Sequence, residues 1–146
     1  METEISTMTP TFIFVDGSYY CFYRYFALQQ WWKNAYPEEP LDNPIENEKF
    51  VEKYKKTFVD NLVQMPKKLG LHKEPVKPIL IVGKDCKREN IWRNDIFKDY
   101  KANRVLDDGF MGGPFFKMAY EDELFIKGGA KAILKHPRLE ADDCIA

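Results

Sequence analysis

The stretch Thr11-Phe12-Ile13-Phe14-Val15-Asp16-Gly17-Ser18 decides the fold, because a short apolar run rich in β-forming residues ends abruptly in a carboxylate. The run from Thr11 to Val15 is typical of a strand that is buried on both faces of a parallel sheet. A carboxylate at the carboxyl end of such a strand points into the crevice where open α/β sheets bind ligands. Ser18 is the expected N-cap of a helix that runs to about Lys33.

Two later stretches repeat this pattern of a short apolar strand followed by acidic residues. Residues 78–83 form the second strand, with Asp85 just beyond it, and residues 131–135 form a third strand. The connection between the first two strands is expected to be a right-handed crossover, which places Asp16 and Asp85 at the same edge of one parallel sheet. Two carboxylates at matching strand ends indicate a shared site.

Helical patterns separate these strands. From about Glu46 to Met65, apolar residues recur at every fourth position, as Phe50, Tyr54, Phe58 and Leu62. Pro114 is expected to open another long helix, which runs through about Lys127 and ends at Gly128-Gly129. The fold class is therefore α/β, with a parallel central sheet and flanking helices.

The third strand leads to the acidic stretch Leu139-Glu140-Ala141-Asp142-Asp143. If a helix begins there, Glu140 and Asp143 share one face, and Asp142 is their neighbour around the turn. Crowded carboxylates suit a hard divalent cation such as Mg²⁺. An acidic first turn that merely complements the helix dipole is the alternative, and the sequence alone leaves both open.

The first helix carries an unusual density of aromatic residues around Arg24. Apolar residues at helical spacing usually face the interior, so most of these rings are expected in the core. The remaining rings could stack on unpaired nucleic-acid bases beside the cation.

Residues 88–104 combine an apolar helical side with basic residues that could contact an anion, namely Arg88, Lys101 and Arg104. A solvated amphipathic helix is the alternative interpretation of the same charge pattern.

Composition limits the classes of protein that fit. A chain of 146 residues with a net charge of −1 fits one domain without overall basicity, so any nucleic-acid surface must be local. Three cysteines without metal-ligand spacing argue against a disulfide framework and a zinc site. An acidic N-terminus and the lack of a long apolar run predict a soluble intracellular protein without a membrane partner.

The assembled pattern resembles the flap-endonuclease-like 5′ nucleases, which belong to the wider PIN-domain group. The matching segments are Phe14-Val15-Asp16-Gly17-Ser18, Asp85, Tyr100-Lys101-Ala102-Asn103-Arg104 and Glu140-Ala141-Asp142-Asp143. Their order and spacing agree with the family across nearly the whole chain. The stretch from Asp108 to Pro114 is most similar to versions encoded by large DNA viruses.

The resemblance implies a three-layer α/β/α fold and metal-dependent hydrolysis of phosphodiester bonds. Mg²⁺ or Mn²⁺, as two ions, would be held by a set of acids: Asp16, Asp85, Glu140, Asp142 and Asp143. Lys101 and Arg104 would act on the scissile phosphate, in a helical gateway over about residues 88–127. The nucleic-acid-binding residues would be Tyr100, Arg88, Phe22, Tyr23 and Arg24. The substrate would be DNA with a free 5′ end or flap, or an RNA–DNA hybrid, with no small-molecule cofactor.

The chain departs from the family in two respects. An aromatic–arginine pair follows the first aspartate by six and seven residues in bacterial and phage members, whereas Phe22 and Tyr23 occupy those positions here and Arg24 comes one later. The family's later acids and its helix-hairpin-helix lie beyond the Glu140–Asp143 motif. The chain is therefore expected to be the N-terminal portion of a 5′ nuclease domain, which by itself cleaves flap DNA negligibly and self-associates or is marginally stable.

Two other functions remain open. A PIN-type ribonuclease also clusters acids at strand ends but need not carry Lys101 and Arg104. An inactive fragment could bind nucleic acid through the basic gateway alone. A phosphatase with a strand-end aspartate nucleophile is less favoured, because Gly17-Ser18 follows Asp16 in place of a second acid two residues on.

Overall fold

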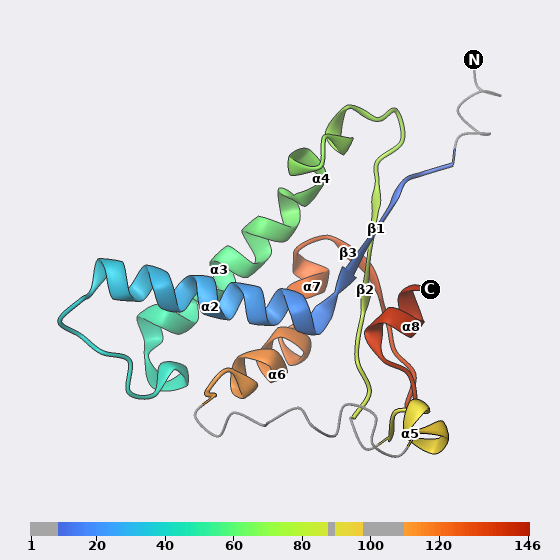
Figure 1. Cartoon of the computed structure of the whole chain (residues 1–146). Helices are drawn as coiled ribbons and strands as arrows, with labels where there is room; N and C mark the ends of the chain where they lie inside the picture. Colours follow the sequence, from blue (N-terminus) through green and yellow to red (C-terminus); the bar gives the residue numbers. More distant parts are fainter. Residues whose placement is uncertain (1–8, 88–89, 98–109) are drawn as a thin grey trace.

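A computed structural model describes residues 9–87, 90–97 and 110–146 of the chain. In this part, the sheet has three strands, which Figure 1 labels: β1 (Phe12–Asp16), β2 (Ile79–Gly83) and β3 (Ala130–Leu134). All pairs are parallel, and the spatial order is β1-β2-β3, with β1 at one edge. The three strands expected from the sequence are confirmed within one residue at either end.

The strand register places the acidic positions at one end of the sheet. Asp16 lies opposite Gly83, and Gly83 lies opposite Leu134. Asp85 follows β2 by two residues, so Asp16 and Asp85 leave the sheet at the same edge, as the sequence predicts.

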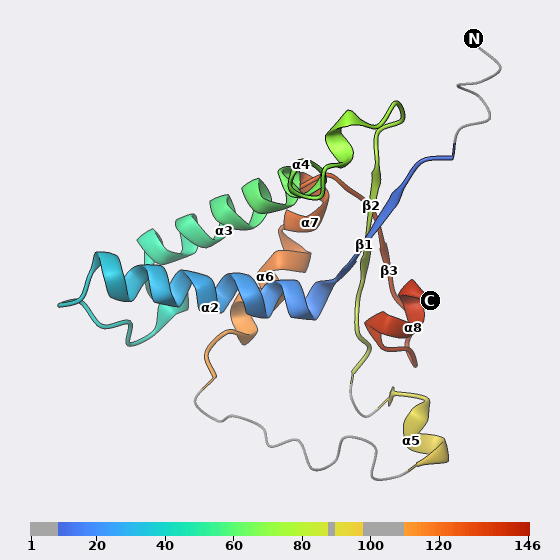
Figure 2. The ribbon, with the colours of Figure 1, turned by 45° about the horizontal axis from the view of Figure 1, so that its top comes forward.

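One face of the sheet is covered by helices, which Figure 2 shows on the side away from α8. They are α2 (Gly17–Ala35), α3 (Glu48–Val63), α6 (Gly113–Glu121) and α7 (Leu124–Lys127). The predicted four-residue repeat is confirmed, because Phe50, Tyr54, Phe58 and Leu62 are all buried. The hydroxyl of Tyr20 donates to the carbonyl of Phe58 at 2.6 Å, which ties α2 to α3. Burial of a large apolar side chain such as Phe58 or Leu62 stabilises the fold by about 1.5–3 kcal/mol.

Shorter elements connect the main ones. Two are 3₁₀ turns, η1 (Pro44–Glu46) and η2 (Leu71–Lys73), and one is the single turn α4 (Met65–Lys68), which follows α3. The described residues of the basic segment contain only the single turn α5 (Arg93–Ile96). The rest of the helix predicted over 88–104 lies outside the described residues.

The long helix predicted from Pro114 to Lys127 is wrong as a continuous element. It breaks at Asp122 and Glu123, and Glu123 takes a left-handed backbone conformation with φ of 55°. A residue other than glycine rarely adopts this conformation. The turn lets Leu124 and Phe125 enter the core beside α3, where both are buried. Burial of these two side chains outweighs the local strain, which the periodic pattern could not reveal.

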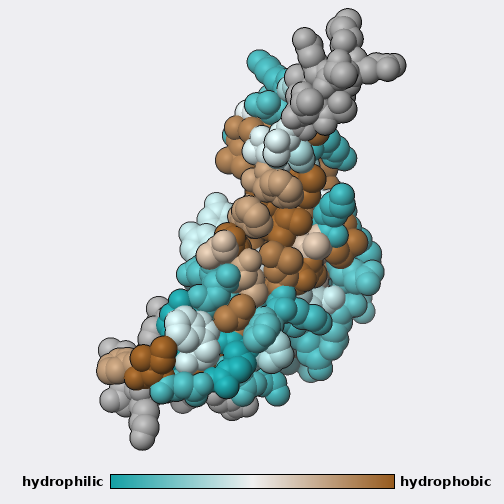
Figure 3. All heavy atoms as spheres, turned by 90° about the vertical axis from the view of Figure 1, so that its right-hand side faces the viewer, coloured by the Kyte–Doolittle hydropathy of each residue, from teal (hydrophilic) through white to brown (hydrophobic). Residues whose placement is uncertain are grey.

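The second face of the sheet is only partly covered. Helix α8 (Ala141–Ile145) lies over the carboxyl end of the strands, and a Cβ at Gly83 would lie 2.9 Å from the carbonyl oxygen of Ala141. Beyond α8, Phe12 and Phe14 of β1 are 47% and 46% exposed. Figure 3 views the molecule from this side and shows a continuous hydrophobic band. The architecture is α/β with a parallel sheet between helices, compatible with three layers.

No helix in the described residues is long and apolar enough to cross a bilayer. The three cysteines, Cys21, Cys86 and Cys144, are free thiols, as their spacing predicts.

Candidate metal centre

Asp16 has two structural roles at the end of β1. It ends the strand, and its Oδ1 atom accepts a hydrogen bond of 3.1 Å from the backbone amide of Tyr19, which makes it the N-cap of α2. The predicted N-cap, Ser18, is therefore wrong, because α2 begins at Gly17 without a connecting loop. The direct passage from strand to helix fixes the Asp16 carboxylate at the sheet edge.

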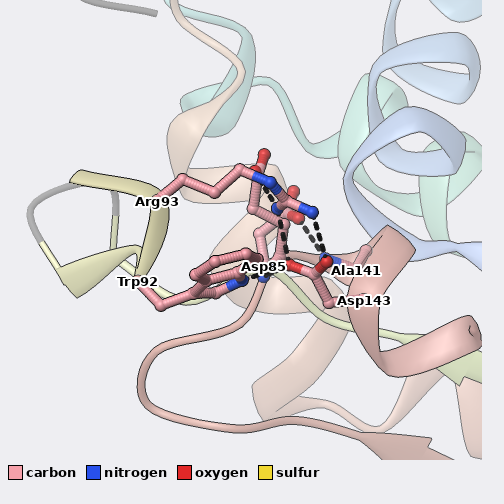
Figure 4. Close-up of polar contacts among 6 residues, drawn as sticks. Asp85, Trp92, Arg93, Ala141 and Asp143 are labelled. Carbon is pink, nitrogen blue, oxygen red and sulfur yellow. Dashed lines mark hydrogen bonds and ion pairs between the residues drawn. The ribbon is translucent and has the colours of Figure 1, made fainter. Parts of the chain in front are cut away.

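Asp85 is tied to the helix that carries the other acids. The backbone amide of Ala141 donates to Asp85 Oδ1 at 2.6 Å, as Figure 4 shows. The amide of Cys86 donates to the carbonyl of Leu139 at 3.0 Å. These two bonds join the segment after β2 to the start of α8, so that Asp142 comes to the same edge as Asp85.

The three aspartates act on one another electrostatically. The pKa of Asp16 is raised, first by burial and then by the negative charges of Asp85 and Asp142, while the hydrogen bond from Tyr19 opposes the shift. Within the described part of the chain, no lysine or arginine forms an ion pair with these three carboxylates. Residues from β1, the β2 end and α8 therefore form a local concentration of negative charge.

We expect Asp16→Asn to raise the free energy of unfolding at pH 7 in EDTA by about 0.5–2 kcal/mol. Asparagine is an equally good N-cap, so the substitution removes the charge and keeps the cap. Because the folded pKa of Asp16 is raised, its contribution to stability is present at low pH and is lost as pH rises through that pKa. Chemical denaturation at pH 4 and pH 7 measures the effect, with Asp42→Asn on the exposed loop as control. Equal pH profiles for wild type and Asp16→Asn would contradict the electrostatic interpretation.

The other two acids of the cluster bind Arg93. Arg93 Nη1 lies 3.0 Å from Glu140 Oε1. Arg93 Nη2 lies 2.6 Å from Asp143 Oδ1 (Figure 4). A second bond joins Nη1 to Asp143 Oδ2 at 2.8 Å, and the indole of Trp92 donates to the same oxygen at 3.2 Å. Asp143 Oδ2 also accepts from the amide of Glu140 at 3.1 Å, as in a capping box. Asp143 therefore caps the start of α8. This is a structural role, as in the alternative interpretation that the acidic turn only stabilises the helix.

Arg93 lowers the pKa of Asp143 to about 2, mainly through its hydrogen bonds. The folded pKa lies below that of the unfolded chain, so the contribution to stability is complete above about pH 4. It is lost as pH falls through about 2. We expect Asp143→Asn to lower the free energy of unfolding by about 1–2 kcal/mol at pH 6. Denaturant titrations should show this difference shrinking towards pH 2, whereas the exposed control Asp60→Asn should match wild type throughout; a pH-independent difference would exclude the ion pair as its cause.

The sequence did not indicate Arg93 or Tyr120 as site residues. The hydroxyl of Tyr120 is buried and has no hydrogen-bond partner in the described residues. Burial, followed by the charges of Cys21, Asp85 and Asp16, raises the pKa of this hydroxyl. A Cβ at position 17 would lie 2.3 Å from the Tyr120 hydroxyl oxygen, so Gly17 makes room for it directly after Asp16. The glycine in the Asp16-Gly17 pair was the only local signal.

The three residues of α2 predicted to bind nucleic acid, Phe22, Tyr23 and Arg24, differ in their contacts. The ring of Phe22 packs against Phe26, Phe110 and Phe116 at centroid distances of 4.7–6.0 Å. Tyr23 is 59% exposed, and the guanidinium of Arg24 lies 5.9 Å from its ring centroid. The other predicted contacts, Arg88, Tyr100, Lys101 and Arg104, lie outside the described residues.

The donor set at the sheet edge suits a hard cation, because it consists of carboxylate oxygens. The negative charges of Asp85 and Asp142 help to raise the pKa of Asp16. A divalent ion between the three carboxylates would remove their mutual repulsion. In the arrangement that residues 9–87, 90–97 and 110–146 adopt, no three histidine, cysteine or acidic side chains are yet close enough to hold one ion. Glu140 and Asp143 are engaged by Arg93, so their role as ligands stays a prediction.

Comparisons of the chain with known protein families, with curated proteins and with solved structures found no match.

Proposed function

We propose that the chain carries the metal-binding edge of a divalent-metal-dependent nuclease that hydrolyses phosphodiester bonds in DNA with a free 5′ end or flap. The observation that carries this proposal is the placement of Asp16, Asp85 and Asp142 at the same end of a parallel sheet. They come from three separate segments, and the pKa of Asp16 responds to the other two charges. Acids gathered in this way suit metal-assisted phosphate chemistry.

Each residue of the edge has a proposed role. Asp16, Asp85 and Asp142 would hold Mg²⁺ or Mn²⁺, which when bound makes a hydroxide available and neutralises phosphate charge. Arg93 neutralises Glu140 and Asp143, and so limits the negative charge that an approaching phosphate meets. Lys101 and Arg104 remain predicted phosphate contacts from outside the described residues.

The nuclease proposal predicts metal-dependent binding of flap DNA. Ca²⁺ is a suitable probe, because it takes the same oxygen ligands as Mg²⁺. We expect Ca²⁺ to tighten the binding of a 5′-flap oligonucleotide about tenfold relative to EDTA, since the cation offsets repulsion between phosphate and carboxylates. Fluorescence anisotropy measures this, and Asp85→Asn should abolish the increase while Glu38→Gln on the proline-bearing loop should retain it.

The same titration separates the competing functions. Tighter Ca²⁺-dependent binding of single-stranded RNA than of flap DNA would favour a PIN-type ribonuclease. Equal binding of flap DNA in Ca²⁺ and EDTA would favour a module that binds nucleic acid without a metal.

A further inference from the structure

A pocket of about 230 Å³ lies beside α2, and residues of α3 and α4 complete its lining. The residues that carry the argument are Tyr19, Tyr23, Arg24, Asn61 and Lys68. Among the residues that the structure describes, this lining includes two cationic side chains and no carboxylate. Arg24 lies eight residues beyond Asp16, or about 12 Å along a helix with 1.5 Å rise per residue. The cationic part of the pocket therefore lies further along α2 than the carboxylate edge, and Tyr19, whose amide binds Asp16, lies between the two.

Arg24 has an unused donor. Its Nε atom is buried and has no acceptor among the residues that the structure describes. The centroid of the Tyr23 ring lies 5.9 Å from the guanidinium carbon, and this contact satisfies no N–H group. A buried donor without an acceptor is unfavourable by about 1–3 kcal/mol in general. A guanidinium stays charged at any ordinary pH and presents a planar fork that matches phosphate oxygens.

Lys68 brings a second positive charge to the same pocket. Its Nζ donates to Asn61 Oδ1 at 3.1 Å. The Asn61 amide nitrogen in turn donates to the carbonyl of Thr57 at 2.7 Å, which fixes the orientation of the amide. Asn61 therefore holds the lysine without neutralising it, and two of the three ammonium protons stay available for an anion.

Two tyrosine rings complete the lining. Tyr19 and Tyr23 are 70% and 59% exposed, so a planar group can reach their rings, although one face of the Tyr23 ring lies beneath the Arg24 guanidinium. Stacking of a base on an aromatic ring next to a cation is the common way in which proteins hold unpaired nucleotides. A cationic pocket beside exposed rings matches a phosphate joined to a base better than it matches a carboxylate ligand.

We propose that this pocket binds the phosphoryl group of a nucleotide unit, between Arg24 and Lys68, while the attached base stacks on Tyr19 or Tyr23. The unit could belong to a nucleic-acid strand or to a free mononucleotide, which share this chemistry. Binding in the pocket needs neither a metal nor cleavage. One part of the proposal rests on the proposed function, namely that the nucleotide unit belongs to a nucleic-acid strand that also contacts the carboxylate edge.

The test measures binding by the whole chain in EDTA, so that the carboxylate edge takes no part. The probes are 5′-dAMP, 2′-deoxyadenosine as the version without phosphate, and a fluorescent single-stranded 12-mer without a terminal phosphate. Lys68→Met and Arg24→Gln should each weaken binding of a phosphate-bearing probe about tenfold, the usual effect of one charge-assisted hydrogen bond. Lys67→Met removes a neighbouring exposed charge that does not line the pocket, and should change affinity less than twofold. Circular dichroism and thermal unfolding verify that each variant is folded.

The outcomes identify the carrier or overturn the pocket. Loss of affinity for the 12-mer alone assigns the pocket to a strand, loss for 5′-dAMP alone assigns it to a free nucleotide, and loss for both assigns it to either. Equal losses in Lys67→Met and Lys68→Met would mean a diffuse charge effect and would overturn the proposal. 2′-Deoxyadenosine binding as tightly as 5′-dAMP would also overturn it, and so would unchanged affinity in folded Arg24→Gln and Lys68→Met. A failed nuclease assay leaves all these results unaffected.

Discussion

Phe14→Lys is expected to convert a self-associating protein into a monomer. Phe14 lies on β1, the edge strand of the sheet in the described part of the chain, and 46% of it is exposed. Its ring and that of Phe12 lie 6.1 Å apart on the same face. An edge strand with unpaired backbone groups and exposed aromatic rings is a template for pairing with another chain.

The rings also continue into a wider apolar face. Phe12 and Phe14 pair in register with Ile79 and Ile81, so these side chains share the face that α8 leaves open. Apolar patches of more than a few hundred Å² are rare on monomers and favour association. A lysine at position 14 places a charge in the middle of this face, and it leaves the buried neighbours Ile13 and Val15 in place.

Light scattering coupled to size exclusion provides the measurement. Wild type is expected to show a mass that rises with concentration, whereas Phe14→Lys should stay near the monomer mass of 17.2 kDa. Leu69→Lys is the matched control, because Leu69 is 58% exposed but lies at the end of α4 and not on a strand. A monodisperse wild-type monomer would contradict the expectation. Equal dissociation by Leu69→Lys would show that added charge alone is responsible.

The strands and the longest helices were predictable because their signals are local. The run Ile79–Gly83 is apolar and β-branched, and the fourth-residue repeat in α3 needs no distant partner to be recognised. The break at Glu123 was not predictable, since it depends on where Leu124 and Phe125 meet α3. Tertiary burial there overrode a continuous helical pattern.

The candidate site was predictable where topology alone fixes it. Parallel strands end at a common edge, so the positions of Asp16 and Asp85 followed from their order after two apolar runs. The ion pairs of Arg93 could not be foreseen, because 47 and 50 residues separate it from Glu140 and Asp143. The cap of α2 was assigned to Ser18 because the sequence does not show that helix and strand join without a loop.

Asp85→Asn is expected to have the largest effect on metal binding. Asp85 is linked to both other acids, because its charge acts on Asp16 and its Oδ1 atom accepts a hydrogen bond from the amide of Ala141, next to Asp142. Asparagine keeps an oxygen for the amide of Ala141, so α8 should stay in place while one negative charge is lost. Affinity for Mn²⁺ should fall at least about tenfold, since carboxylate charge dominates the binding of hard cations.

Calorimetric titration of Mn²⁺ into wild type, Asp85→Asn, Asp142→Asn and the loop control Glu38→Gln measures whether the aspartates share one metal site. With one shared site, Asp85→Asn and Asp142→Asn each lose about tenfold or more in affinity, and Glu38→Gln binds like wild type. Equal Mn²⁺ affinities in all four proteins would contradict the claim that the strand-end aspartates form a metal centre.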